Sequence, residues 1–174
     1  IPIRIGVNSG SVSKDLIEKH GGPTAQALVE SALSHVNILE EEDFTDICLS
    51  LKASSVPITI ESYRLMSKMR NYPLHIGVTE AGTAFAGTIK SAIGIGALLS
   101  EGIGDTIRVS LTDQPEEEVR VGIAILKSLQ LRKGGIEVVS CPTCGRTQID
   151  LIGLAQQVEQ AVENIDKDIK IAVM

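Results

Sequence analysis

Arg4-Ile5-Gly6-Val7-Asn8 is the first of four five-residue stretches that share one template: polar, apolar, small, apolar, polar. The others are residues 48–52 (CLSLK), 75–79 (HIGVT) and 108–112 (RVSLT). Side chains alternate faces along a strand, so each stretch places two branched aliphatic side chains on one face and small or polar groups on the other. The segments between the stretches are long and have helical patterning, so helices would cover the aliphatic face. The template predicts parallel βα units.

The predicted helices follow each of the four stretches. Their apolar positions recur at helical spacing, and the last opens with a proline and three glutamates, which suit a helix N-terminus. They are expected at residues 23–42, starting near Thr24 or Gly22, and at 57–70, 88–100 and 115–131. Four such units fit about 130 residues, whereas a complete eight-stranded barrel takes roughly twice that. The fold class is therefore α/β, with half of a TIM-type barrel over residues 1–133.

A second, smaller α/β domain is expected from residue 134 to residue 174. The pattern changes at residues 132–135 (RKGG), and the next strand, 136–140, does not follow the five-residue template. A helix is expected from about 148 to 164, followed by a strand at 169–174. Because the chain begins and ends inside apolar strand-like runs, we expect it to be part of a longer protein and this second domain to be incomplete.

The composition excludes several classes of function. The 174 residues are 43% hydrophobic and carry a net charge of −6, so the chain lacks the overall positive charge that is typical of nucleic-acid-binding proteins. The chain contains two Tyr, two Phe and no Trp, too few for a base-stacking surface. No apolar run approaches the length of a membrane span, and the start does not resemble a signal peptide. The expected location is therefore the cytoplasm, with no membrane partner.

The polar face of the predicted sheet carries several cations. Packed barrels usually fill this side with aliphatic residues, whereas here Arg4, Asn8, Lys52 and Arg108 would lie on it. Two guanidinium groups and an ammonium group converging with Ser110 suit a phosphate or diphosphate, because Arg offers a bidentate fork and Lys a mobile charge. The alternative is that the arginines pair with acidic residues of the barrel and have a structural role only.

For three further residues the sequence gives weaker evidence of a functional role. Glu80 directly follows the third template stretch, so it could donate a proton or anchor a substrate hydroxyl, or serve as a structural counter-ion. His75 in the middle of a strand is more often a satisfied interior residue than a catalyst. Cys48 is expected to be a buried and inert thiol.

Cys141-Pro142-Thr143-Cys144 at a strand-to-helix junction is the sharpest chemical signal in the chain. It is compatible with a thioredoxin-type dithiol, with half of a zinc site or with two ligands of an iron–sulfur cluster. The chain contains three cysteines and no second Cys-x-x-Cys, so both metal sites would need ligands from beyond Met174 or from a partner chain.

Six segments extend these observations over nearly the whole chain: residues 4–11 (RIGVNSGS), 52–54 (KAS), 79–82 (TEAG), 91–94 (SAIG), 101–110 (EGIGDTIRVS) and 140–146 (SCPTCGR). In order and spacing they closely resemble the 4-hydroxy-3-methylbut-2-enyl diphosphate synthases, iron–sulfur reductases of the non-mevalonate isoprenoid pathway. The resemblance implies a TIM-type barrel followed by a C-terminal iron–sulfur domain. Residues 1–133 would then be the second half of that barrel, and residues 134–174 the start of the cluster domain.

The resemblance also implies an activity and a set of site residues. The reaction would be the two-electron reductive ring opening and dehydration of 2-C-methyl-D-erythritol 2,4-cyclodiphosphate. Glu80 would be the catalytic carboxylate that acts on the departing hydroxyl. The substrate-binding residues implied by the matching motifs are Arg4, Asn8, Lys52, Arg108 and Ser110. Cys141 and Cys144 would hold a 4Fe–4S cluster.

The cofactor and partners follow from the same resemblance. The remaining cluster ligands, a third Cys and a Glu, are expected beyond Met174. The implied electron donor is ferredoxin or flavodoxin, and members of the family form head-to-tail homodimers. We expect this chain by itself to be inactive. The alternatives are a metal-free dithiol oxidoreductase, which leaves the polar sheet face unexplained, and a zinc-stabilised domain without catalysis.

Overall fold

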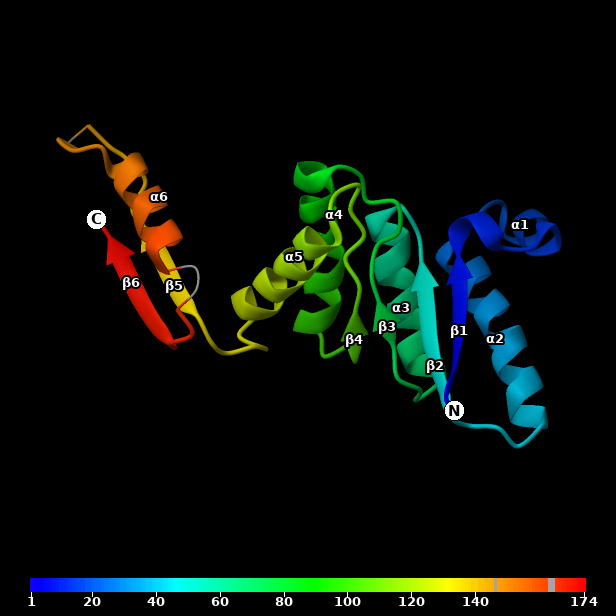
Figure 1. Cartoon of the computed structure of the whole chain (residues 1–174). Helices are drawn as coiled ribbons and strands as arrows, with labels where there is room; N and C mark the ends of the chain where they lie inside the picture. The colour runs from blue at the N-terminus through cyan, green and yellow to red at the C-terminus, as the bar shows by residue number, and fades with distance from the viewer. Residues whose placement is uncertain (146, 163–164) are drawn as a thin grey trace. The chain divides into compact units, whose positions relative to one another are not determined.

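The computed structural model of the chain describes residues 1–145, 147–162 and 165–174. The chain divides into two compact units, Ile1–Leu129 and Gln130–Met174, which are treated separately below. The elements of the first unit are β1 (Ile3–Asn8), the 3-10 turn η1 (Ser9–Ser11), α1 (Lys14–His20), α2 (Ala25–Glu41), β2 (Ile47–Lys52), α3 (Val56–Met69), β3 (His75–Ile76), α4 (Ala84–Ser100), β4 (Thr106–Ile107) and α5 (Pro115–Ser128) (Figure 1).

The strands of the first unit are parallel, as the template predicts. β1 pairs with β2 over six residues, from Ile3–Ile47 to Asn8–Lys52, and β3 pairs with β4. A single bridge between Leu49 and Leu74 joins β2 to the segment that leads into β3. The strands therefore follow one another in space in the order β1, β2, β3 and β4, each separated along the chain by at least one helix.

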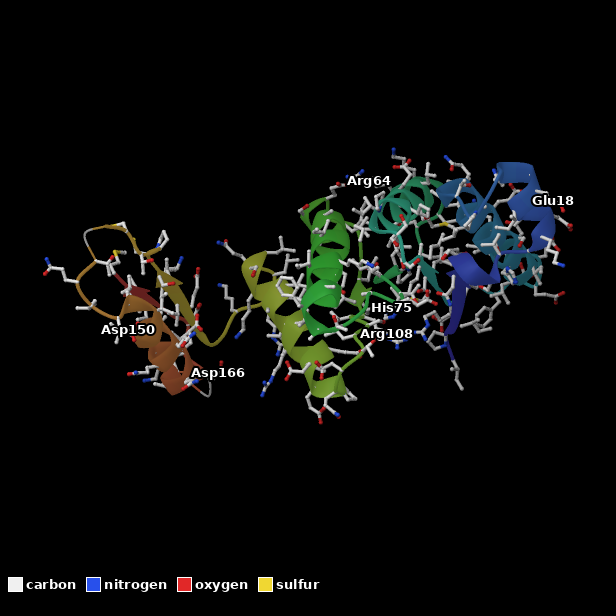
Figure 2. All side chains as sticks on the ribbon, turned by 90° about the horizontal axis from the view of Figure 1, so that it is seen from above. Glu18, Arg64, His75, Arg108, Asp150 and Asp166 are labelled. Carbon is white, nitrogen blue, oxygen red and sulfur yellow. The ribbon has the colours of Figure 1, made fainter. Side chains whose placement is uncertain are left out.

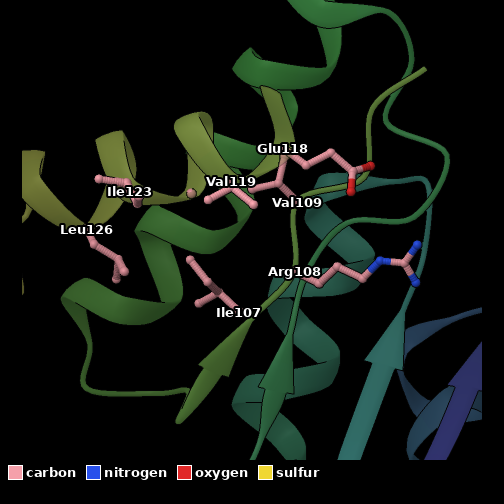
Figure 3. Close-up of a pocket in the computed structure, with 8 residues that line it drawn as sticks. Ile107, Arg108, Val109, Glu118, Val119, Ile123 and Leu126 are labelled. Carbon is pink, nitrogen blue, oxygen red and sulfur yellow. The ribbon is translucent and has the colours of Figure 1, made fainter. Parts of the chain in front are cut away.

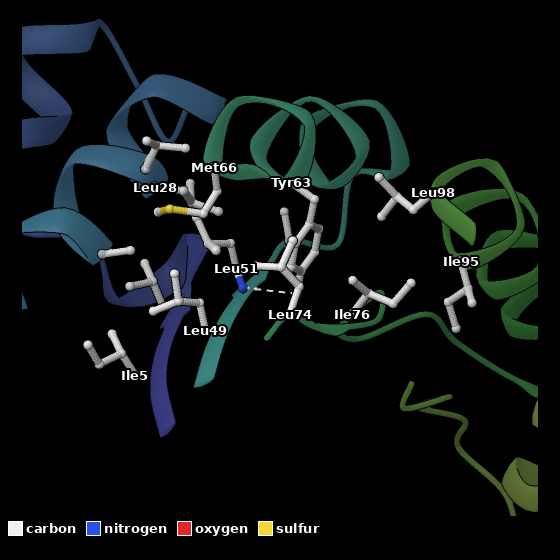
Figure 4. Packing of buried hydrophobic residues seen from close by; sticks show 14 of the residues in the cluster. Ile5, Leu28, Leu49, Leu51, Tyr63, Met66, Leu74, Ile76, Ile95 and Leu98 are labelled. Carbon is white, nitrogen blue, oxygen red and sulfur yellow. Dashed lines mark hydrogen bonds between the residues drawn. The ribbon is translucent and has the colours of Figure 1, made fainter. Parts of the chain in front are cut away.

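The aliphatic residues of all four stretches face the helices. In β1, Ile5 and Val7 are buried whereas Arg4 and Asn8 are exposed. The core that these residues join is formed with α2, α3 and α4, and Figure 4 shows its side chains between the strands and the helices. The buried aliphatic residues contributed by the four stretches are Ile5, Val7, Leu49, Leu51, Ile76, Val78 and Val109. This alternation is the predicted one.

The third and fourth strands are shorter than the template predicts. Regular pairing in β3 ends at Ile76, and β4 precedes the stretch that begins at Arg108. The alternation of side chains nevertheless continues past the regular strands. Arg108 is exposed and donates its backbone N–H to the carbonyl oxygen of Ile76 at 2.9 Å, whereas the next residue, Val109, is 3% exposed. A side chain from α3 interrupts the pairing of β2 with β3, as described below.

The predicted helices are present, with shifted ends. The hydroxyl of Thr24 accepts a hydrogen bond from the Ala27 N–H at 3.3 Å, which caps α2 as expected. α4 begins four residues earlier than the pattern indicated. Helix α1 was not predicted because it has only seven residues. Its end could have been read from Gly21, which adopts a left-handed backbone with φ 70° and donates its N–H to the Ile17 carbonyl oxygen.

The second unit contains β5 (Ile136–Ser140), α6 (Leu151–Val162) and β6 (Ile169–Val173). Its two strands are parallel, and their register runs from Ile136–Ile169 to Ser140–Val173. The Asp150 carboxylate accepts the Gly153 N–H at 3.0 Å at the start of α6. Positions 146, 163 and 164 of the predicted motif and helix lie outside the described residues. In the described part of the chain, none of the helices has the length and hydropathy that crossing a membrane requires.

Candidate functional site

The polar face of the first unit gathers side chains from β1, β2 and the segment after β4. Strand β1 contributes Arg4 and Asn8, and Asn8 lies directly opposite Lys52 of β2 in the parallel register. The segment after β4 contributes Arg108. A Cβ added to Gly6 would meet no atom within 4 Å, so this face is open at β1. The face that the template predicted to be polar is therefore open at β1, whereas Ser50 and Lys52 of β2 are buried.

Lys52 is the most buried of these cations, with 9% of its surface exposed. Its Cε lies 3.6 Å from the position that a Cβ on Gly77 would occupy, so its aliphatic stem crosses from β2 toward the residue after β3. Burial, followed by the charges of Arg108 and Arg4, lowers the pKa of Lys52 to about 8. Lys52 is therefore both buried and close enough to Arg108 and Arg4 for their charges to disfavour its protonated form.

His75 lies within this group of charges. Its Nδ1 is 2.7 Å from the hydroxyl oxygen of Thr106, its register partner on β4. Burial, followed by the charges of Lys52, Arg4 and Arg108, lowers the pKa of His75 to about 4. The imidazole is therefore neutral at pH 7 and adds no positive charge to the face. Figure 2 shows His75 and Arg108 close to each other in the first unit.

The cations of the polar face differ from those elsewhere in the first unit. On the outer surface, for example, Arg70 pairs with Glu40 at 3.1 Å. Among the residues that the structure describes, no carboxylate forms an ion pair with Arg4, Lys52 or Arg108. Unpaired like charges in proximity raise the free energy of the empty site and favour an anionic ligand.

Arg108 separates two surfaces of the first unit. Its neighbours Ile107 and Val109 face α5 and contribute to an apolar hollow of about 290 Å³ between β4 and that helix. Figure 3 shows the Arg108 side chain extending away from the aliphatic residues of this hollow. Glu118 of α5 accepts the Leu111 N–H at 2.8 Å, and so fixes the loop that carries Ser110, which is half-buried.

Glu80 occupies the loop after the third stretch and is exposed. Its φ of 51° lies in the left-handed region, which costs a residue with a side chain about 1 kcal/mol. Gly82 in the same loop accepts the Thr112 N–H at 2.9 Å, which ties the loop to the end of the fourth stretch. Within the described ranges, Glu80 forms no ion pair. Among the described residues, no cation therefore pairs with Glu80 as a structural counter-ion would require.

Cys141 and Cys144 are both exposed in the loop after β5. The Cys141 N–H donates to the Val173 carbonyl oxygen at 3.0 Å, and the Cys144 N–H donates to the Thr147 hydroxyl at 3.1 Å. Two accessible thiols suit iron or zinc, and they supply two of the four ligands that either centre needs. The described residues contain no group of three or more potential metal ligands, so the set is partial.

Two residues of α3 were not singled out by the sequence patterns. Tyr63 and Thr59 are fully buried and direct hydroxyl groups at the backbone beside Lys52. Cys48 lies on the polar face and is half-buried, and burial raises the pKa of its thiol. Tyr63 and Thr59 could have been recognised in the sequence as polar side chains at buried positions of a helix, because a buried hydroxyl requires a hydrogen-bond partner.

Comparison with known proteins accounts for both units. Residues 1–123 match the GcpE TIM-barrel domain, and residues 137–174 match the GcpE protein C-terminal domain. The chain belongs to the GcpE family. The family that the sequence motifs indicated is thereby confirmed.

Relatives of the GcpE family match the chain over its whole length. Proteins from Ruminiclostridium cellulolyticum and Clostridium perfringens are each 66% identical over 174 residues, and one from Geobacter sulfurreducens is 62% identical. All three are named 4-hydroxy-3-methylbut-2-en-1-yl diphosphate synthase (flavodoxin). The match covers 100% of this chain and 49–50% of each relative, so the chain spans about half of their length.

Proposed function

We propose that the protein carrying this chain catalyses the two-electron reductive ring opening of 2-C-methyl-D-erythritol 2,4-cyclodiphosphate. The reaction consumes two electrons and two protons, and releases 4-hydroxy-3-methylbut-2-enyl diphosphate and water. The observation that carries the proposal is a group of cations on the polar face that, among the described residues, have no carboxylate partner, in a unit of the GcpE TIM-barrel family. The names of the relatives supply the reaction class.

Substrate binding is assigned to Arg4, Asn8, Lys52, Arg108 and Ser110. The guanidinium groups donate paired hydrogen bonds to phosphoryl oxygens, and the Lys52 ammonium supplies a single charge between them. Because burial and like charges depress the pKa of Lys52, a bound diphosphate stabilises its protonated form. The binding energy thus includes relief of repulsion that exists in the empty site.

Glu80 is proposed as the catalytic carboxylate. Its exposed side chain follows the third stretch, in a loop tied to the fourth stretch through Gly82 and Thr112. The proposed role is to hold or deliver a proton at the hydroxyl oxygen that leaves as water. The left-handed backbone of Glu80 supports this role, because strain of this kind is concentrated at functional sites.

The architecture proposed for the complete protein is a TIM-type barrel followed by a cluster domain. Residues 1–133 form the second half of the barrel, and residues 134–174 begin the iron–sulfur domain. Four parallel βα units with a polar inner face support the first assignment, and the match of residues 137–174 to the family's C-terminal domain supports the second.

Cys141 and Cys144 are proposed to hold a 4Fe–4S cluster, with the remaining ligands supplied by residues beyond Met174. Their exposed thiols and the soft character of thiolate ligands support this assignment. When bound, such a cluster supplies electrons and a Lewis-acidic iron. We further propose a flavodoxin or ferredoxin donor, a head-to-tail homodimer and a cytoplasmic setting in which thiols stay reduced.

The proposal is tested with the full-length protein after anaerobic reconstitution with iron and sulfide. We expect the 4Fe–4S absorption spectrum and product formation from the cyclic diphosphate with reduced flavodoxin. The 174-residue chain treated in the same way should give neither a stoichiometric cluster nor turnover, because it holds two thiol ligands in one Cys-x-x-Cys pair. A reconstituted full-length protein that holds only zinc, or that works as a metal-free dithiol, would overturn the proposal.

A further inference from the structure

A hydroxyl group takes the place of a backbone hydrogen bond between β2 and β3. The Leu49 N–H donates to the carbonyl oxygen of Pro73 at 2.8 Å, and a bridge pairs Leu49 with Leu74. In that parallel register, the next bond would join the Leu51 N–H to the carbonyl oxygen of His75.

The phenol oxygen of Tyr63 lies between those two backbone groups. It accepts the Leu51 N–H at 2.9 Å, drawn as a dashed line in Figure 4, and donates to the His75 carbonyl oxygen at 2.7 Å. Tyr63 comes from α3 and is fully buried. Burial raises the pKa of the phenol, so its proton stays in place to donate to His75.

A second hydroxyl from α3 serves the next backbone group of this segment. The Thr59 hydroxyl accepts the Ala53 N–H at 3.2 Å and lies 3.1 Å from the Ala53 carbonyl oxygen. Direct backbone bonding across the strands then resumes, because the Thr79 N–H donates to the same Ala53 carbonyl oxygen at 3.2 Å. Tyr63 and Thr59 therefore satisfy the backbone on either side of Lys52.

This arrangement separates the strands next to Lys52. Two hydrogen bonds in series span the interval between Leu51 and His75 that one bond spans in an ordinary ladder. On the other side of β3, Gly77 packs so closely against the backbone carbonyl of Arg108 that a Cβ would clash. The Lys52 stem extends over Gly77, at the point where β3 approaches the Arg108 segment and is held away from β2.

We propose that the Tyr63 hydroxyl positions the anion site, by holding β2 and β3 apart so that the Lys52 ammonium lies within reach of the same ligand as Arg108. Tyr63 is thus a positioning residue that contacts no ligand. The inference extends the anion-binding role proposed above for Lys52 and Arg108. Its test includes a measurement on Lys52 that needs no ligand.

The test compares Tyr63→Phe with Tyr72→Phe in the full-length protein. Tyr72 is the other tyrosine of the chain, and its hydroxyl is 3.0 Å from Glu40 on the outer surface, so its variant is a matched control. Pyrophosphate affinity is measured by calorimetry, and the pKa of Lys52 by NMR of its side chain. We expect Tyr63→Phe to weaken pyrophosphate binding about tenfold, because one charge-assisted hydrogen bond is misplaced.

The same variant should raise the pKa of Lys52 toward its value in water, because the ammonium group moves away from the guanidinium groups of Arg108 and Arg4. Tyr72→Phe should change neither quantity. Unchanged affinity and unchanged Lys52 pKa in folded Tyr63→Phe would overturn the inference. If the wild-type protein does not bind pyrophosphate, the anion-site proposal fails, whereas the Lys52 pKa still decides the role of Tyr63.

A second pair of variants covers the case in which Tyr63→Phe does not fold. Thr59→Val removes the neighbouring hydroxyl at nearly constant volume, and Thr59→Ser retains it. We expect Thr59→Val to shift the Lys52 pKa in the same direction as Tyr63→Phe, and Thr59→Ser to restore the wild-type value. Equal Lys52 pKa values in both Thr59 variants would contradict the positioning role of the α3 hydroxyls.

Discussion

The two units of the chain stabilise themselves to very different extents. Among the described residues, the buried aliphatic and aromatic side chains of the unit Gln130–Met174 are Leu151 and Val173, whereas Ile1–Leu129 has an extensive core. The first unit presents unpaired cations on a face supported by that core, and the second presents two exposed thiols with little core behind them. Small units of this kind usually depend on a metal or a partner for stability. The two units thus differ both in the size of their cores and in the kind of reactive groups that they expose.

The largest expected effect comes from the second unit. Cys144→Ser in the full-length protein should abolish the cluster and lower turnover more than about a thousandfold, or about 4 kcal/mol in the barrier. Iron content and product formation measure both losses. Cys48→Ser in the first unit is the matched control and should leave the iron content unchanged. A full iron complement in Cys144→Ser would break the proposed division of chemistry between the units.

Core substitutions test the difference in stability. Leu28→Ala in α2, at a site with no exposed surface, should lower the free energy of unfolding by about 3 kcal/mol because it leaves a cavity. Leu151→Ala in α6 should cost about 1 kcal/mol in the metal-free protein, since the surrounding side chains are mostly exposed and can collapse. Denaturant titrations with probes in each unit give both values. Equal costs would show that the second unit has a core comparable with the first.

The cation group of the first unit is tested by Lys52→Met. The substitution keeps the buried stem and removes the charge, so pyrophosphate binding should weaken between about tenfold and a hundredfold. Lys19→Met on α1, where the lysine pairs with Glu30 at the surface, should change the affinity less than twofold. Calorimetric titration of the three proteins decides the outcome. A similar loss in both variants would point to nonspecific attraction of the anion.

The smallest effect is a dependence of stability on pH. The pKa of Lys52 is about 8 in the folded protein and 10.5 for the free side chain, so the unfolded chain binds more protons between these values. The buried charge therefore lowers the stability of the fold below about pH 8, and this cost disappears as the pH increases from about 8 to about 10. Melting temperatures of wild type minus Lys52→Met should increase by a few degrees over that range. If the melting temperatures of the wild type and of Lys52→Met changed equally with pH, Lys52 would not be buried among like charges.

Much of the first unit could be predicted because the signals are local. The alternation in Arg4–Asn8 and its three counterparts depends only on strand geometry, and Thr24 caps its own helix. The lengths of β3 and β4 could not be predicted in this way. They depend on the close contact of Gly77 with Arg108 and on the insertion of Tyr63, which join segments distant in the sequence.

The same limit applies to the candidate site. The sequence by itself determined which residues share the polar face, the alternation that buries the aliphatic side chains, and the Cys141–Cys144 pair, because each follows from spacing along one segment. Only the tertiary structure decided that Lys52 is buried, that its pKa falls under the influence of Arg108, and that a hydroxyl from α3 separates β2 from β3. Burial and electrostatic energies depend on distances through space, and those distances exist only after the βα units have packed together.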